Sequence, residues 1–520
     1  MIRKFILALF ILLILILTLV LAVYFFVLKK PHTSSQFIFP AQQTKLFEID
    51  TSSFIDIDYG KQIATGSPLI FGGAHAPNLE HQDAWDKIAE VGVTAIRRDF
   101  YIENELPTNI TLNDYKNNIN NITNPENWNQ KNIQSTNQIY QNAKERGMKV
   151  MGILSFTPAW LTYSGKTKGV PKDWDVYEDI VKKVYKLHRN YIDYLEIWNE
   201  PDYKLFLDLK NTPYSKEEAY ALIYFYAQKA VREVDQEIND GKEIPIGAII
   251  VSNPTDIAFF ESVLSKIIIT SRIDFISYHN YGHLSEPSWI YYKDILNKYG
   301  KSNIPIYLTE WNAPDIYKTS RYTNLAISYT GSKLISFLNM GLPMADYYAM
   351  LDLNRSKNPN DDPSFAFYIW EDGKAKLLPQ AKTWRLLSVS LGLGKGESKI
   401  FNTQYAITNT ILSLTPSTSN AVGFEDIFGK KGLAVVNDED EEIVVNVTMI
   451  NSQIKPSLLT RTEVDVYVAN MDDDGGSVVE NTPVEAKNGK IQFKIKLPAQ
   501  SVVGVLLRDS NILKEIFNSQ

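Results

Sequence analysis

The 520-residue sequence contains no cysteine, so disulfide bonds, thiolate metal sites and a cysteine nucleophile are all excluded. No cluster of ligand residues in the sequence demands a metal, and we expect neither a metal nor another cofactor. The formal net charge is −7 and basic residues form no stripe, so the sequence gives no sign of a nucleic-acid partner. No G-x-G-x-x-G turn follows the first expected strand, which argues against a doubly wound dinucleotide fold.

Aromatic residues are abundant by contrast, with 29 Tyr, 24 Phe and 9 Trp. Sugar rings stack on aromatic faces, so this content suits a protein that binds carbohydrate, although large aromatic cores account for most of these residues. The contents of 44% hydrophobic and 22% charged residues are ordinary for a globular protein. The length of the chain predicts two domains and one extra segment.

A long apolar run near the N-terminus predicts a membrane anchor. Residues 5–28 are interrupted only by Thr18, and basic residues flank both ends of the run. About 20 apolar residues suffice to cross a bilayer. The run exceeds the core of a signal peptide, and no A-x-A site follows it, so we expect an uncleaved single-pass anchor over residues 1–30 rather than a cleaved signal. Charge alone leaves the orientation open.

Strand and helix patterns alternate over residues 67–392, which predicts parallel βα units and an α/β fold. The eight expected strands are Leu69–Gly73, Ala95–Phe100, Lys149–Phe156, Tyr194–Glu200, Ile246–Val251, Phe275–Asn280, Ile306–Glu310 and Ala345–Leu351. The helical patterns between them include Asp83–Val91, Ile133–Arg146, Val176–Arg189, Lys216–Ile238 and Tyr322–Asn339. This count is typical of a (β/α)8 TIM barrel.

Other segments surround this barrel in the chain. Residues 31–66 are predicted to be a linker followed by strands that join a second domain. Residues 393–510 contain short strands separated by turns, which predict an accessory antiparallel β-sandwich, and residues 511–520 form a tail. Two long connections, over residues 101–131 and 352–378, are expected at the C-terminal face of the barrel. There they would form the walls of an open substrate cleft. An open cleft would favour endo cleavage of a polymer.

Two glutamates stand at the tips of two expected strands. Glu200 lies in Trp198-Asn199-Glu200-Pro201, and Glu310 lies in Thr309-Glu310-Trp311-Asn312. The C-terminal tips of barrel strands hold the catalytic groups of TIM-barrel enzymes. Two carboxyl groups there are the parts that glycoside hydrolysis requires.

The neighbours of the two glutamates predict different roles. Trp198 and Pro201 would give Glu200 an apolar setting that suits a proton donor. A nucleophile at Glu310 would need hydrogen-bond donors that keep it ionised, and Arg97 and Tyr281 are the candidates.

Together these motifs resemble the retaining clan A glycoside hydrolases, and glycoside hydrolase family 39 in particular. The resemblance rests on the segments 196–202, 277–281 and 308–312, and on 497–502 as a closing strand of the sandwich. It implies Glu200 as the acid/base and Glu310 as the nucleophile. It also implies Asn199 as a donor to the sugar 2-hydroxyl, Tyr281 as a partner of Glu310, and His279 as a residue of the sugar subsite.

Other residues near strand ends are candidates for binding the sugar. They are His75, after the first strand, and the possible stacking platforms Trp160, Trp311 and Trp370. One departure from the family concerns its iduronidase branch, where the second strand tends to read Arg-x-His. Here it reads Arg97-Arg98-Asp99, and the charge of Asp99 would repel a uronate carboxylate.

The sequence therefore predicts a membrane-anchored retaining glycoside hydrolase that acts on a polysaccharide or oligosaccharide. Such an enzyme meets its substrate outside the cell, so we expect a catalytic domain on the extracytoplasmic side of the cell membrane. Two alternatives stay open, a catalytically inactive carbohydrate-binding protein on the same barrel and a transglycosylase.

Overall fold

The computed structural model describes residues 53–252, 254–281, 286–312, 322–351, 366–406, 420–452, 460–484, 486–487 and 489–511. All of them belong to one compact unit that begins at Ser52. The predicted anchor over residues 1–30 and the tail after residue 511 lie outside the described residues. Among the residues that the structure describes, no helix has the length and apolarity needed to span a bilayer.

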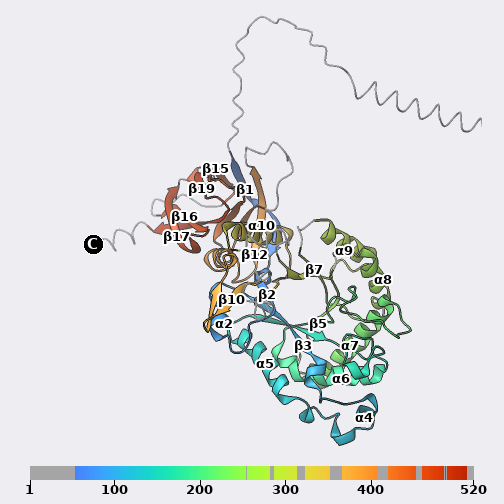
Figure 1. Cartoon of the computed structure of the whole chain (residues 1–520). Coiled ribbons are helices and arrows are strands. Elements are labelled where there is room, and N and C mark those ends of the chain that lie inside the picture. Colours follow the sequence, from blue (N-terminus) through green and yellow to red (C-terminus); the bar gives the residue numbers. More distant parts are fainter. Residues whose placement is uncertain are drawn as a thin grey trace, which may run out of the picture. The chain divides into compact units, whose positions relative to one another are not determined.

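Eight parallel strands close into a barrel (Figure 1), so the predicted α/β barrel fold is confirmed. In barrel order the strands are β2 (Gly72–Ala74), β3 (Ala95–Tyr101), β4 (Lys149–Ser155), β5 (Tyr194–Ile197), β6 (Ile246–Val251), β7 (Phe275–Asn280), β8 (Ile306–Trp311) and β9 (Ala345–Tyr347). Each of them overlaps one strand expected from the sequence pattern. Closure leaves no free edge, because β9 pairs with β2.

Helices surround the barrel strands in the ribbon view (Figure 1). They are α2 (Gln82–Glu90), α5 (Gln130–Glu145), α6 (Trp174–His188), α7 (Lys216–Ile238), α8 (Ile257–Ile267), α9 (Glu286–Lys298), α10 (Asn324–Met340) and α11 (Gln380–Trp384). Local chemistry sets their ends. Ser215 and Glu218 form a capping box at the start of α7, and Asp173 caps α6 through the backbone N–H of Val176.

The barrel interior changes from apolar to polar along its axis. An apolar layer is formed by Met151, Phe275 and Met344, against which Leu69, Tyr194 and Tyr307 pack. Charged side chains occupy the interior nearer the C-terminal strand ends, where Arg97 contacts both Glu196 and Glu310. The apolar layer therefore seals one end of the barrel below a polar interior.

The two long connections contain more regular structure than the sequence predicts. Residues 101–131 include the short helices α3 (Ile102–Glu105) and α4 (Leu112–Lys116), and Trp128 is buried there with its Nε1 donating to the carbonyl of Ile122. Of the connection over 352–378, residues 352–365 lie outside the described residues. The rest contains the paired strands β10 (Tyr368–Glu371) and β11 (Lys374–Leu377).

A second sheet has ten strands, and all of them except β1 follow the barrel in the chain. Its order is β17 (Asp474–Val484), β16 (Thr460–Ala469), β20 (Ser501–Asn511), β14 (Lys431–Asn437), β13 (Ala421–Glu425), β12 (Ser398–Ala406), β1 (Phe54–Gly66), β15 (Ile443–Ile450), β19 (Lys490–Leu497) and β18 (Ala486–Lys487). The expected all-antiparallel pattern is wrong at one place, since β1 pairs parallel with β15. This is possible because β1 precedes the barrel and no hairpin fixes its direction.

The two faces of this sheet bury different cores. On β14, Leu433 and Val435 belong to the sheet domain's own core, whereas Ala434 and Val436 belong to the core shared with the barrel. Helix α10 packs on that second face, and a Cβ at Gly331 would lie 2.4 Å from a methyl group of Val502. The absence of a side chain at Gly331 thus allows the close approach of helix and sheet.

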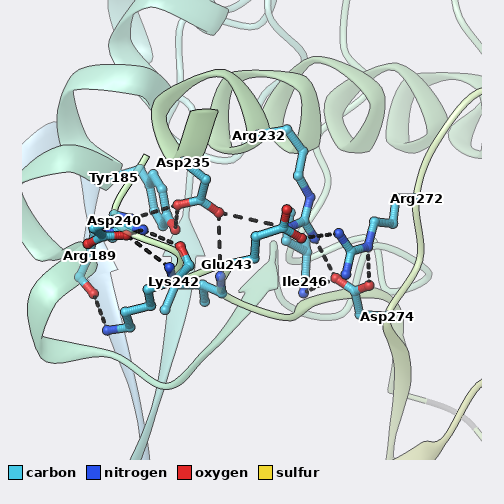
Figure 2. Close-up of polar contacts among 11 residues, drawn as sticks. Tyr185, Arg189, Arg232, Asp235, Asp240, Lys242, Glu243, Ile246, Arg272 and Asp274 are labelled. Atoms are coloured by element: carbon cyan, nitrogen blue, oxygen red, sulfur yellow. Dashed lines mark hydrogen bonds and ion pairs between the residues drawn. The ribbon is translucent and has the colours of Figure 1, made fainter. Parts of the chain in front are cut away.

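Ion pairs gather near the starts of strands β6 and β7 (Figure 2). Arg189 is buried and donates to Asp235 Oδ1 over 2.6 Å and to both carboxylate oxygens of Asp240. Asp274, which precedes β7, accepts from Arg272 Nε over 2.6 Å and from the backbone N–H of Ile246 over 2.9 Å. These contacts join α6, α7 and two strands at the N-terminal face, the face that serves stability in TIM barrels.

We expect Arg189→Met to lower the free energy of unfolding by about 3–5 kcal/mol, because it removes the shorter ion pair of the buried Asp235 carboxylate and leaves only the longer contact with Arg232 at 3.8 Å. Arg272→Met is the matched control, since Arg272 is half exposed and its pairs contribute about 1 kcal/mol or less. Urea unfolding of the variants measures both values. Equal, small losses in the two variants would contradict the structural role of Arg189.

Candidate active site

The residues that carry Glu200 form a turn rather than the end of a strand. Strand β5 stops at Ile197, and the backbone is left-handed at Trp198 (φ 75°) and Glu200 (φ 48°). The expected strand through Glu200 is therefore three residues too long. Such conformations cost about 1–3 kcal/mol each and persist where the surroundings hold them. Here Trp198 is fully buried and donates from Nε1 to the carbonyl of Phe206 over 2.8 Å.

Glu310 is the fifth residue of β8, and its side chain is turned into the barrel toward Arg97. The next residue, Trp311, packs outside the barrel, stacked on Trp384 with ring centroids 5.7 Å apart and edge-on to Phe337 of α10. Only 1% of Trp311 is exposed. The prediction that Trp311 is a sugar platform is wrong, because neighbouring residues of a strand face opposite sides.

Arg97 on β3 connects three groups of the site. Its Nε donates to Glu196 Oε2 over 2.7 Å, its Nη1 to Glu310 Oε1 over 2.6 Å, and its Nη2 to Asn199 Oδ1 over 2.8 Å. The guanidinium is buried, and the fixed fork of its N–H groups sets the directions of all three contacts. Arg97 thus acts beneath the carboxylates and has almost no surface for a ligand.

His279 lies between the two glutamates. Its Nδ1 is 2.7 Å from Glu200 Oε1 and 3.4 Å from Glu310 Oε2. The ring has no exposed surface, so the expected contact with a sugar is replaced by a contact with the carboxylates. Tyr281 donates its hydroxyl to Glu310 Oε2, as the sequence proposes.

The carboxyl groups of Glu200 and Glu310 are close together. One oxygen of each, together with a ring nitrogen of His279, forms a set of atoms that all lie within 4.8 Å of one another. Among the described residues, this is the set of side chains with the spacing of metal ligands. His279 donates to one oxygen of Glu200, and Tyr281 donates to one oxygen of Glu310.

The protonation of the site follows from its charges. Burial alone would raise the pKa of Glu310, but the charges of His279 and Arg97 and the hydroxyl of Tyr281 outweigh it and hold the pKa below its usual value. Burial disfavours the charged form of His279, yet Glu310 and Glu200 raise the pKa of the imidazole above 6.5. Glu310 is therefore ionised near neutral pH, and His279 keeps its proton to a higher pH than an ordinary histidine.

Two interior acids were not predicted from the sequence. Glu196 on β5 pairs with Arg97, and Asp346 on β9 is fully buried with both carboxyl oxygens unpaired among the described residues. Burial raises the pKa of Asp346 far above its usual value. The charge of Arg97 lowers this pKa, and the charges of Glu196 and Glu310 raise it, but these effects are smaller than that of burial. The signal in the sequence is an acid inside an otherwise apolar strand, which marks a paired or neutral carboxyl group.

The remaining predicted residues pack against aromatic neighbours. The ring of His75 packs edge-on against Tyr348 with centroids 4.8 Å apart, and burial lowers the pKa of its imidazole. Trp160, after β4, stacks on Tyr115 at 5.6 Å. Trp370 on β10 stacks on His81 at 3.9 Å, so one face of that indole is covered. A role for Trp160 or Trp370 in stacking on sugars stays a prediction.

The arrangement can hold one carboxylate ionised beside a second carboxyl group in a different environment. Glu310 receives hydrogen bonds from Arg97 and Tyr281, whereas Glu200 receives one from His279. Two acids with different partners can act as a nucleophile and a proton donor at the same pH.

The fold is similar to solved structures of glycoside hydrolases. A glucosidase from Croceicoccus marinus matches with a TM-score of 0.62 at 14% identity, over 88% of this chain and 99% of that one. A GH39 enzyme from Xanthomonas axonopodis pv. citri gives 0.61 at 12% identity, over 89% and 99%. A monomeric β-xylosidase from Caulobacter crescentus CB15 gives 0.58 at 14% identity, over 88% and 99%. No family model and no curated protein sequence matches the chain.

We expect Glu200→Gln to lower the pKa of His279, because it removes the carboxyl group whose ionised form favours the imidazolium through its charge and its hydrogen bond. A histidine whose pKa is raised by folding stabilises the protein fully below pH 6.5, and this contribution is lost as the pH rises through the folded pKa. NMR titration of the imidazole signals measures the shift. Glu237→Gln, an exposed change on α7, is the control. An unchanged or higher pKa in Glu200→Gln would contradict the described contact.

Proposed function

We propose that this protein is a retaining glycoside hydrolase in which Glu310 is the nucleophile and Glu200 is the general acid and base. The main support is the separation of the two carboxyl groups, with one oxygen of each within 4.8 Å of the other. Retaining enzymes hold their carboxyl groups about 5–5.5 Å apart, whereas inverting enzymes need about 6.5–9.5 Å to admit a water. The site also lies at the C-terminal strand ends, where TIM-barrel enzymes carry their chemistry.

In the first step the ionised Glu310 attacks the anomeric carbon of the sugar. The bond from that carbon to the leaving oxygen breaks, and Glu200 gives its proton to the oxygen. Arg97 and Tyr281 hold Glu310 in place for the attack, each through one carboxylate oxygen. A covalent glycosyl ester on Glu310 results.

In the second step Glu200, now ionised, removes a proton from water as the water attacks the anomeric carbon. The ester bond to Glu310 breaks and the sugar leaves with its original configuration. His279 Nδ1 donates to Glu200 Oε1 and stabilises the carboxylate between the two steps.

Asn199 is oriented for a contact with the sugar. Its Oδ1 accepts from Arg97 Nη2 over 2.8 Å, which directs its amide nitrogen away from the guanidinium. The amide N–H groups are thus left to donate to a substrate hydroxyl. The resemblance of the sequence to family 39 assigns this contact to the 2-hydroxyl, where such hydrogen bonds strengthen in the transition state.

The proposed substrate is a polymer or oligomer of uncharged sugars such as xylose or glucose. The solved structures of similar fold include β-xylosidases, xylanases and a glucosidase. Asp99 on β3 lies close enough to influence the pKa of both His75 and Tyr348 beside the site, and its charge disfavours a uronate. The apolar run over residues 5–28 supports a membrane anchor that places the barrel outside the cell.

We expect Glu200→Ala to reduce kcat/KM about 10²–10⁴-fold on oligosaccharides, whose leaving groups need a proton. On a 2,4-dinitrophenyl glycoside the loss should be about tenfold or less, because this leaving group departs without protonation. Steady-state kinetics on both substrate types tests the assignment, with the exposed change Glu237→Ala as control. Equal losses on both substrates would contradict an acid role for Glu200.

A further inference from the structure

A cavity of about 250 Å³ lies beside the carboxylate site. It is bordered by the segment after β2, the end of β3, helix α3 and helix α5. Its lining residues are His75, Arg98, Asp99, Tyr101, Asn104, Glu105, Asn132, Ser135, Thr136 and Ile139. The volume is slightly below the range of about 300–1,000 Å³ typical of small-molecule pockets, so it suits one compact molecule.

Glu105 is one of the residues that line this cavity, and one of its carboxyl oxygens is unsatisfied within the described part of the chain. The residue is 1% exposed, and its Oε1 lies 2.7 Å from His188 Nε2. His188 in turn directs Nδ1 to Asn137 Oδ1 over 2.7 Å, so the imidazole is held in place from both sides. The other oxygen, Glu105 Oε2, has no hydrogen-bond partner among the described residues.

A buried acceptor without a partner costs about 1–3 kcal/mol, and more when it is charged. A hydroxyl group of a ligand in the cavity would donate to Glu105 Oε2 and remove this cost. The catalytic steps proposed above make no use of Glu105 or His188, so the unpaired oxygen has no explanation in the carboxylate site.

The other walls of the cavity suit a ring that carries several hydroxyl groups. Asp99 offers a second carboxylate, of which one oxygen accepts from Ser155 Oγ over 2.6 Å. Arg98 contributes a guanidinium that is anchored by Nη1 to the carbonyl of Ala76 over 2.9 Å. Ser135 and Thr136 add hydroxyls from α5. Tyr101 and Ile139 supply apolar surface against which the C–H face of a sugar can pack.

Aromatic side chains connect the cavity to the nucleophile. The ring of His75 packs edge-on against Tyr348, and Tyr348 packs edge-on against Tyr281 with centroids 5.8 Å apart. Tyr281 donates its hydroxyl to Glu310. The cavity is therefore separated from the reacting carboxylate by a short row of rings.

We propose that this cavity binds an uncharged sugar unit of the substrate, next to the unit that reacts at Glu310. The inference rests on the proposed function. Two carboxylates, Asp99 and Glu105, face one guanidinium, Arg98, so a uronate would meet net negative charge while a neutral sugar would meet both donors and acceptors.

The test compares substrates that differ in whether they can reach the cavity. Thr136→Leu and Ser135→Leu each remove a hydroxyl and fill part of the cavity from α5, with a residue that favours a helix. Gln134→Leu makes the same change at an exposed neighbouring position outside the cavity and is the control. The full-length chains are assayed on the 4-nitrophenyl β-glycoside and the tetrasaccharide of xylose and of glucose.

We expect the ratio of kcat/KM for the tetrasaccharide to kcat/KM for the aryl glycoside to fall about tenfold or more in Thr136→Leu and Ser135→Leu. The ratio should stay unchanged in Gln134→Leu. An unchanged ratio in the two cavity variants, with circular dichroism that matches the parent, would overturn the proposal and leave the hydrolase function standing.

A crystal of the unmodified chain soaked with D-xylose provides a readout that does not depend on turnover. A sugar hydroxyl within hydrogen-bond distance of Glu105 Oε2 supports the proposal, and a cavity filled only with water overturns it. If the unmodified chain cleaves none of the substrates, the proposed function fails. The soak then still tests whether the cavity binds a sugar.

Discussion

The contact of Arg97 with three partners is the interaction on which the site depends. It holds Glu196, Glu310 and Asn199 by separate N–H groups and thereby ties strands β3, β5 and β8 to one another inside the barrel. Removing one partner of a buried ion pair costs about 3–5 kcal/mol. Without the guanidinium, Glu196 and Glu310 would be like charges in a water-poor interior, so one arginine makes both the local fold and the ionised nucleophile possible.

The remaining charges are arranged around this centre so that Glu310 and Glu200 have different electrostatic surroundings. The charges of His279 and Arg97 and the hydrogen bond from Tyr281 hold the pKa of Glu310 below its usual value. Glu200 stands on a left-handed turn above His279, with that imidazole as its hydrogen-bond partner. Burial raises the pKa of Asp346 strongly and thereby favours its neutral form, which limits the negative charge in the interior. The difference between the two glutamates is therefore a property of their neighbours, as acid–base catalysis requires.

The sequence predicts the strands and the two glutamates well because both are local signals. Apolar runs of strand length, separated by helical patterns, recur along the barrel, and each glutamate follows such a run directly. What the sequence does not predict depends on contacts between distant segments. The left-handed turn at Trp198 is held by the burial of its ring, and the direction of Trp311 depends on which side of β8 faces the barrel. The parallel pairing of β1 with β15 joins segments almost 400 residues apart, such as Phe54 and Asn446.

The most direct test of the account is to identify the residue that bonds to the sugar. The full-length chain would be incubated with the 2,4-dinitrophenyl 2-deoxy-2-fluoro-β-glycosides of xylose and glucose, which slow the second step and allow the ester to accumulate. Peptide mass spectrometry should then find one sugar on Glu310, and Glu310→Gln should take up no label and lose turnover about 10³-fold or more. Label on Glu200, or hydrolysis with inverted configuration and no labelled glutamate, would contradict the assignment of Glu310 as the nucleophile.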